Sequence, residues 1–154
     1  MAMKITCPAF ANGASIQPPY TCTGRNLSPA LEWSGLPLNT QSLALILEDP
    51  DAPGGTFYHW LLYELPPSIG KLPGAQPKTG SLDDYGKQGI NSFGRIGYDG
   101  PCPPPGKAHR YFLYLYALDS MPSLMTGLKV ADIKTAMHGH ILDQAETFGI
   151  FKKS

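Results

Sequence analysis

An aspartate and two histidines stand at the ends of the most apolar segments of the sequence. Asp49 directly follows SLALILE, His59 directly precedes WLLYEL, and His109 directly precedes RYFLYLYAL. Taken singly, each histidine is more typical of a structural residue than of a site residue. If the three segments are neighbouring strands, however, the three side chains converge at one mouth of the fold. Two imidazoles and a carboxylate could then bind an anion, hold a metal ion or carry out acid–base chemistry.

The sequence DPDAPGG, which begins at Asp49, has the properties of a stiff loop. Pro50 and Pro53 restrict the backbone and each removes an N–H donor. Asp49 and Asp51 are therefore expected to be held rigidly at the end of a buried strand, where a carboxylate can be aimed into a cleft. Ordinary turn formation by Asp and Pro is the equally weighted alternative.

The three kinds of chemistry are not equally supported. The sequence has no GxSxG nucleophile motif and no GxxxxGK[ST] phosphate loop, and Cys102 is enclosed by prolines. The wide spacing of the histidines and the aspartate neither supports nor excludes a metal site. Glycines at 94, 97 and 100 would let backbone N–H groups approach an anion closely. Anion binding is preferred, and the alternative is a metal-assisted or His–Asp hydrolase acting on a phosphoester or related ester. No catalytic residue, metal ligand or cofactor is assigned.

Composition restricts the classes of partner. Twelve basic residues balance twelve acidic ones, and no basic run is present, so neither nucleic acid nor an anionic membrane surface is an expected partner. The sequence has no signal-peptide pattern and no apolar stretch of membrane-spanning length, which predicts a cytoplasmic protein without integral membrane association. Cys7, Cys22 and Cys102 form a sparse, odd set. Reduced thiols are favoured over a Cys7–Cys22 disulfide.

Hydrophobic patterning predicts one domain over residues 1–154, a β-sandwich with a helix packed on it. The three apolar segments, together with shorter ones at 4–6 and 31–33, are typical of strands, and helix-length segments between them are missing. Seventeen of the 33 Gly and Pro residues lie between Leu65 and Ala108, which predicts long irregular loops. Apolar positions from Val130 to Phe148 recur at steps of three and four, which predicts a C-terminal helix capped by Gly149.

Several of these segments together resemble the phosphatidylethanolamine-binding protein family, which includes Raf kinase inhibitor-like proteins. The resemblance rests on DPDAP at Asp49–Pro53, GTFYHW at Gly55–Trp60, GPCPPPGKAHRYFLYLYAL at Gly100–Leu118 and MHGHIL at Met137–Leu142. Their order and spacing are similar to the bacterial and archaeal branch. The resemblance implies two antiparallel sheets with a Greek-key element, and a pocket for phosphate, acetate or a phospholipid head group. Members of this branch also suggest a homodimer as one expected assembly. A separate hypothesis is an inhibitor of a kinase or protease, with the Pro-rich loops as the surface that contacts this protein partner.

The resemblance also implies roles for individual residues. Its pocket residues correspond to the following positions: Asp49, Asp51, His59, Gly100, Pro101, His109 and Tyr111. Pro53 and Arg110 are expected to support them, with Arg110 holding the DPDAP loop through Asp51. The chain departs from the animal members because its C-terminal helix offers His138 and His140 where they have a tyrosine. A packed structural role is favoured for His140.

Overall fold

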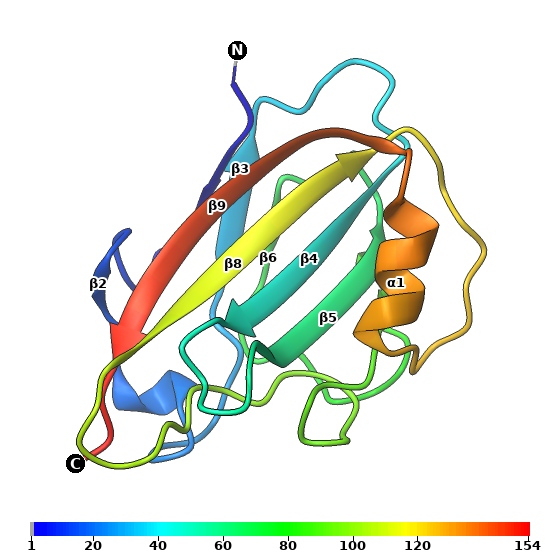
Figure 1. The fold of residues 1–154 in the computed structure, drawn as a ribbon. Helices are drawn as coiled ribbons and strands as arrows, with labels where there is room; N and C mark the ends of the chain where they lie inside the picture. Colours follow the sequence, from blue (N-terminus) through cyan, green and yellow to red (C-terminus); the bar gives the residue numbers. More distant parts are fainter. Residues whose placement is uncertain (1) are drawn as a thin grey trace.

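The computed structural model describes residues 2–154, which form two β-sheets, one α-helix and two 3-10 helices (Figure 1). The strands are β1 (Lys4–Thr6), β2 (Ala14–Ser15), β3 (Leu31–Ser34), β4 (Ser42–Asp49), β5 (Phe57–Leu65), β6 (Lys71–Leu72), β7 (Lys87–Gln88), β8 (His109–Leu118) and β9 (Ile141–Phe151). The helices are η1 (Pro18–Tyr20), η2 (Asp83–Tyr85) and α1 (Val130–Met137). No helix within residues 2–154 is long and apolar enough to cross a membrane.

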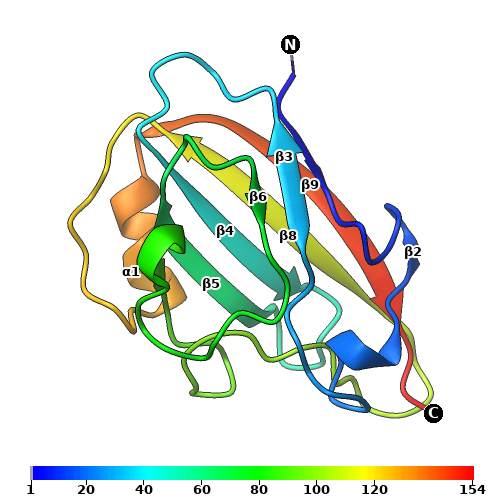
Figure 2. The same ribbon diagram turned by 180° about the vertical axis from the view of Figure 1, so that it is seen from behind.

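The sheets have the expected sandwich arrangement with a Greek-key element. The small sheet has the order β1-β3-β6, and the large sheet has the order β2-β9-β8-β4-β5-β7. Within the large sheet β8 returns to lie beside β4, so β8-β4-β5-β7 has the 4-1-2-3 order of a Greek key. Its pairings are antiparallel except for the short parallel pair of β2 with β9. Figure 2 shows the small sheet lying across the large one.

The central strand β4 is apolar on both faces because each face is covered. Leu43, Leu45 and Leu47 belong to the core between the two sheets. Ala44 and Ile46, which alternate with them, belong to a second cluster under α1. A strand buried on both sides needs apolar residues throughout, which explains the continuous run SLALIL. The strands predicted from such runs are confirmed.

The C-terminal helix is shorter than predicted. It ends at Met137, Gly139 has a left-handed φ of 81°, and the chain then forms β9 along the full length of β8. Pairing with β8 satisfies the backbone hydrogen-bonding groups of residues 141–151 and buries alternate side chains. These contributions to stability outweigh the helix preference that the spacing of the apolar residues indicates. Gly149 lies inside β9 rather than at a cap. A Cβ on it would lie 2.5 Å from Cγ1 of Ile16, so the glycine allows close packing.

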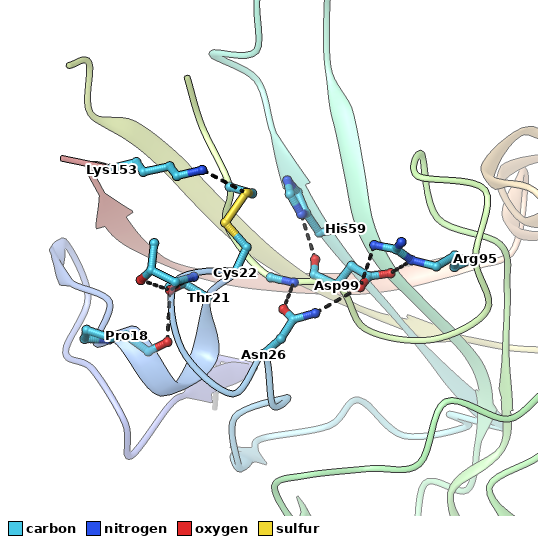
Figure 3. Close-up of a disulfide and its surroundings, with 11 residues drawn as sticks. Pro18, Thr21, Cys22, Asn26, His59, Arg95, Asp99 and Lys153 are labelled. Carbon is cyan, nitrogen blue, oxygen red and sulfur yellow. Dashed lines mark hydrogen bonds and ion pairs between the residues drawn. A yellow bond between two sulfur atoms is a disulfide. The ribbon is translucent and has the colours of Figure 1, made fainter. Parts of the chain in front are cut away.

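The cysteine expectation is wrong. Cys22 and Cys102 form a disulfide across a sequence separation of 80 residues, and Cys7 is free and buried (Figure 3). The fold brings the loop after η1 against the segment before β8, and backbone N–H of Cys22 donates to the carbonyl of Pro101 at 3.1 Å. The sequence separation gave no sign of this pairing.

Candidate functional site

A cavity of about 190 Å³ opens at the end of the large sheet where β4 ends. It is lined by residues of the loop after β4, the start of β5, the loop at 90–96 and the segment before β8, together with the first residues of β8. The lining residues are Asp49, Ala52, Pro53, Phe57, His59, Phe93, Cys102, Pro103, Pro104, His109 and Tyr111. The wall is therefore mostly apolar, with a few polar groups set into it.

Strand order explains why Asp49, His59 and His109 meet. In the large sheet β4 lies between β5 and β8, and all three strands have a terminus at the cavity. Side chains two residues apart on a strand share a face, so Phe57 lies on the same face of β5 as His59, and Tyr111 lies on the same face of β8 as His109. The structure thus unites the three residues at one mouth of the fold, as their positions in the sequence predicted.

Asp49 positions His109 and has both carboxylate oxygens occupied. Nδ1–H of His109 donates to Oδ2 of Asp49 at 2.7 Å, with both side chains buried. Backbone N–H of Asp51 donates to Oδ1 of Asp49 at 2.8 Å. A charge-assisted hydrogen bond in a buried site fixes the ring firmly. Asp49 therefore acts as a positioning residue for the imidazole.

His59 is held by a backbone group. Its Nδ1–H donates to the carbonyl of Asp99 at 2.7 Å, and the residue is only 3% exposed. Burial lowers the pKa of His59, and the Asp99 carbonyl and the Asp49 charge oppose this only in part. With Nδ1 of each ring engaged, Nε2 is the atom left for a ligand, because residues 2–154 make no hydrogen bond to Nε2 of either His59 or His109.

The Tyr111 hydroxyl is a buried polar group without a partner among the described residues. Its side chain lines the cavity and is 1% exposed, with the His59 ring packed edge-on against it. Burial raises the pKa of Tyr111, and the Asp49 charge raises it further, although the hydroxyl has no well-aligned hydrogen bond to that carboxylate. Buried hydroxyls are nearly always hydrogen-bonded in native proteins, so this one awaits an acceptor.

The other predicted site residues differ in their relation to the cavity. Pro53 lines the cavity, whereas Asp51, Gly100, Pro101 and Arg110 do not.

Arg110 and Asp51 form the expected pair. The Arg110 side chain donates to the Asp51 carboxylate at 2.8 and 2.9 Å, and the backbone N–H of Arg110 adds a third bond at 2.9 Å. These bonds lower the pKa of Asp51 to about 2. Gly100 is required by packing, because a Cβ on it would lie 2.1 Å from the carbonyl oxygen of Tyr20.

Three residues that contact His59 were not among the predicted site residues. Phe57 packs edge-on against Phe93, and both contact the His59 ring. Phe57 could have been found from its two-residue spacing to His59 on one strand. Asp99 had no such signal, because its carbonyl is what binds His59. The Asp99 carboxylate receives bonds from a cluster of polar side chains, which are Asn26, Lys78, Asn91 and Arg95.

The histidines after α1 lie apart from the cavity. His138 is exposed, and His140 is about half exposed with Nδ1 2.8 Å from the Asp119 carboxylate. The packed role expected for His140 is wrong, because the helix ends before it. Within residues 2–154 no group of three or more His, Cys, Asp or Glu side chains is arranged to hold a metal ion.

Comparisons with known proteins show which family the chain belongs to. The sequence model for phosphatidylethanolamine-binding proteins matches residues 6–152. A UPF0098 protein of Methanothermobacter thermautotrophicus is 43% identical over 151 residues, covering 98% of this chain and 99% of the relative. One from Aquifex aeolicus is 42% identical over 153 residues, covering 98% and 89%.

Two solved structures share the fold over the whole chain. A phosphatidylethanolamine-binding protein homologue from Chlamydia trachomatis has a TM-score of 0.91 and 39% identity, covering 99% of each chain. Escherichia coli YbcL, a member of the mammalian family of these proteins, has a TM-score of 0.92 and 29% identity, covering 100% of each chain. This chain, with its histidine-lined cavity at the mouth of a Greek-key sandwich, belongs to the phosphatidylethanolamine-binding protein family.

Proposed function

We propose that the protein binds a small anion, a phosphate or carboxylate group, in the cavity between His59, His109 and Tyr111. The observation that carries the proposal is the buried Tyr111 hydroxyl, which has no partner among residues 2–154 and lines a cavity that also holds two anchored imidazoles. A ligand oxygen at this point satisfies the hydroxyl and removes the cost of burying it unpaired.

The tautomers of His59 and His109 determine which hydrogen-bonding groups the ligand must have. Because a carbonyl and a carboxylate only accept, Nδ1 of His59 and of His109 must carry a proton. Nε2 then donates only when the ring is protonated and accepts when the ring is neutral. His59, whose pKa is lowered by burial, presents an accepting Nε2 near neutral pH. The site therefore suits an anion that keeps one acidic proton, such as a hydrogen phosphate, or that binds together with a proton.

Cavity size limits the ligand to a small group. A volume of about 190 Å³ lies below the roughly 300–1,000 Å³ of sites that enclose drug-sized molecules. Phe57 and Phe93 stand at the wall, and Phe93 is 40% exposed. A head group can enter while the rest of a larger molecule, such as a phospholipid, stays outside against these rings.

Calorimetric titration with inorganic phosphate, acetate and glycerophosphoethanolamine between pH 5.5 and 8 tests the proposal. We expect affinity to fall as pH rises, because the His59 imidazole loses the Nε2 proton that faces the anion. His59→Gln should weaken binding and flatten this dependence. His138→Gln, a change at an exposed histidine away from the cavity, is the matched control. Absence of binding across the range would refute the proposal.

The Asp49–His109 pair supports one alternative function. A histidine whose Nδ1–H is held by a buried carboxylate is the arrangement of a general base, here with a distance of 2.7 Å. The alternative is hydrolysis of a phosphoester or related ester by an activated water. Turnover of p-nitrophenyl phosphate that is lost in both Asp49→Asn and His109→Gln would favour it over simple binding.

Regulation of a protein partner, such as a kinase or protease, stays a prediction that rests on the Pro-rich loops as a contact surface. Cys102, Pro103 and Pro104 of the proline-rich segment line the cavity, so a ligand in the cavity could alter the surface offered to a partner. Inhibition of a purified kinase or protease that changes when phosphate is added would support this coupling.

A further inference from the structure

The Cys22–Cys102 disulfide forms part of the cavity wall. Cys102, Pro103 and Pro104 line the cavity, and the disulfide ties this segment to the loop after η1. Figure 3 shows the sulfur–sulfur bond between the loop carrying Cys22 and the segment that continues from Asp99. The redox state of these two sulfurs therefore bears directly on the shape of the site.

Few backbone hydrogen bonds hold this wall in place. Four of the six residues at 100–105 are prolines and have no backbone N–H to donate. Within the described residues the backbone of the segment makes two hydrogen bonds: Gly100 N–H to Oδ1 of Asn26 at 2.7 Å, and Cys22 N–H to the Pro101 carbonyl at 3.1 Å. Both partners lie on the loop that the disulfide anchors, so opening the disulfide weakens both of these backbone attachments together.

The same loop also positions His59. Nδ2–H of Asn26 donates to the Asp99 carboxylate at 3.0 Å, while Oδ1 of Asn26 accepts from Gly100 (Figure 3). The Asp99 carbonyl between them accepts the bond from the His59 ring. Displacement of the Cys22 loop therefore disturbs the orientation of His59 as well as the wall.

The disulfide is also placed for thiol exchange. Cys22 is an exposed residue, and Nζ of Lys153 lies 3.9 Å from Sγ of Cys102. A thiolate that attacks Sγ of Cys22 breaks the sulfur–sulfur bond and expels Cys102 as a thiolate, which the nearby ammonium stabilises. The second thiol of a dithiol then attacks the mixed disulfide and releases Cys22, and the dithiol becomes a cyclic disulfide. Two electrons and two protons pass to the protein, while Cys7, the third cysteine, stays buried in the core.

We propose that this disulfide is a redox switch for the cavity: a dithiol reductant opens it, releases the 100–105 wall and weakens anion binding. The proposal rests on the anion-binding function proposed above. Disulfides that occur in a reducing compartment are usually transient or redox-sensing, whereas in an oxidising compartment the same bond would keep the site permanently formed.

The test compares phosphate affinity of the oxidised protein with that of the protein reduced by dithiothreitol, with reduction verified by the mass of two added hydrogens. We expect affinity to fall about tenfold on reduction, within the usual range of coupling between sites. The C22S/C102S double variant should bind as the reduced protein does under both conditions. Cys7→Ser is the matched control and should respond to the reductant as the wild type does.

A second readout separates this proposal from the proposed function. The Nδ1–H resonance of the His59 ring, held by Asp99 in the oxidised protein, should exchange faster with solvent after reduction. If phosphate binds equally to both forms within about twofold, the switch is refuted. If no anion binds even the oxidised protein, the proposed function fails. The His59 resonance then decides the switch alone, and an unchanged exchange rate overturns it.

Discussion

Replacing Tyr111 by phenylalanine should make the protein more stable and its anion binding weaker. The hydroxyl is buried, lines the cavity and has no hydrogen-bond partner among residues 2–154. Phenylalanine fills the same space without a polar atom. A change that improves stability while it damages binding is the signature of a group kept for a ligand.

The magnitudes follow from the environment of the hydroxyl. An unsatisfied buried polar group costs about 1–3 kcal/mol, which for a chain of this size corresponds to a rise in Tm of about 2–12 °C on its removal. A hydrogen bond to a charged ligand contributes about 1.5–3 kcal/mol, so phosphate affinity should fall by about 10- to 150-fold.

Thermal unfolding and calorimetric titration of Tyr111→Phe measure both effects. The matched control is Tyr114→Phe, which removes a hydroxyl from the opposite face of β8, where the ring is only half-buried and stacks between Phe112 and Tyr116. We expect the control to leave Tm and affinity nearly unchanged. A fall in Tm of Tyr111→Phe would refute the reasoning, because it would mean that the hydroxyl donates to Asp49 in the free protein.

Three further predictions concern the surroundings of the cavity. Because burial lowers the pKa of His59, the unfolded chain binds a proton more readily, so the free energy of unfolding in urea should decrease as pH falls below about 6.5. His59→Gln should reduce this slope, and an unchanged slope would show that the ring is not desolvated. Arg110→Ala should raise the pKa of Asp51 from about 2 toward its ordinary 3.8, measured by carboxyl NMR, with little loss of stability because the Arg110 side chain is exposed to solvent. The stability that the Arg110–Asp51 pair contributes is present above the ordinary pKa of Asp51 and is lost as pH falls toward 2. Arg110→Ala should also weaken phosphate binding. Unchanged folding and binding in this variant would contradict a supporting role for Arg110. Gly100→Ala should lower both Tm and phosphate affinity, because its Cβ meets the Tyr20 carbonyl oxygen; normal values for both would show that the wall tolerates displacement.

The sequence predicted the structure best where a single physical requirement determined the residue types of a segment. SLALILE predicts a doubly buried strand because no other element needs apolar residues at successive positions, and β4 is such a strand. Asp49, His59 and His109 could be predicted to converge because each adjoins such a segment. The family resemblance added Tyr111, whose role depends on the missing partner of its hydroxyl.

The errors arose where distant parts of the chain decide the outcome. Residues 141–148 have helical spacing, yet β8 offers them a complete edge for pairing, which no local pattern records. The Cys22–Cys102 disulfide and the bond from His59 to the Asp99 carbonyl join segments 80 and 40 residues apart. Every residue type has a backbone carbonyl, so the sequence could not identify Asp99 as the residue that orients His59.

The most direct test of the central claim is a titration of the four imidazoles with phosphate, followed by ¹⁵N NMR. We predict that the Nε2 resonances of His59 and His109 shift together and saturate at one affinity, while Nδ1 of each ring stays protonated. His138 and His140, which lie outside the cavity, serve as internal controls and should not move. Equal shifts in all four histidines, or shifts confined to the two controls, would contradict the assignment of the cavity as the anion-binding site.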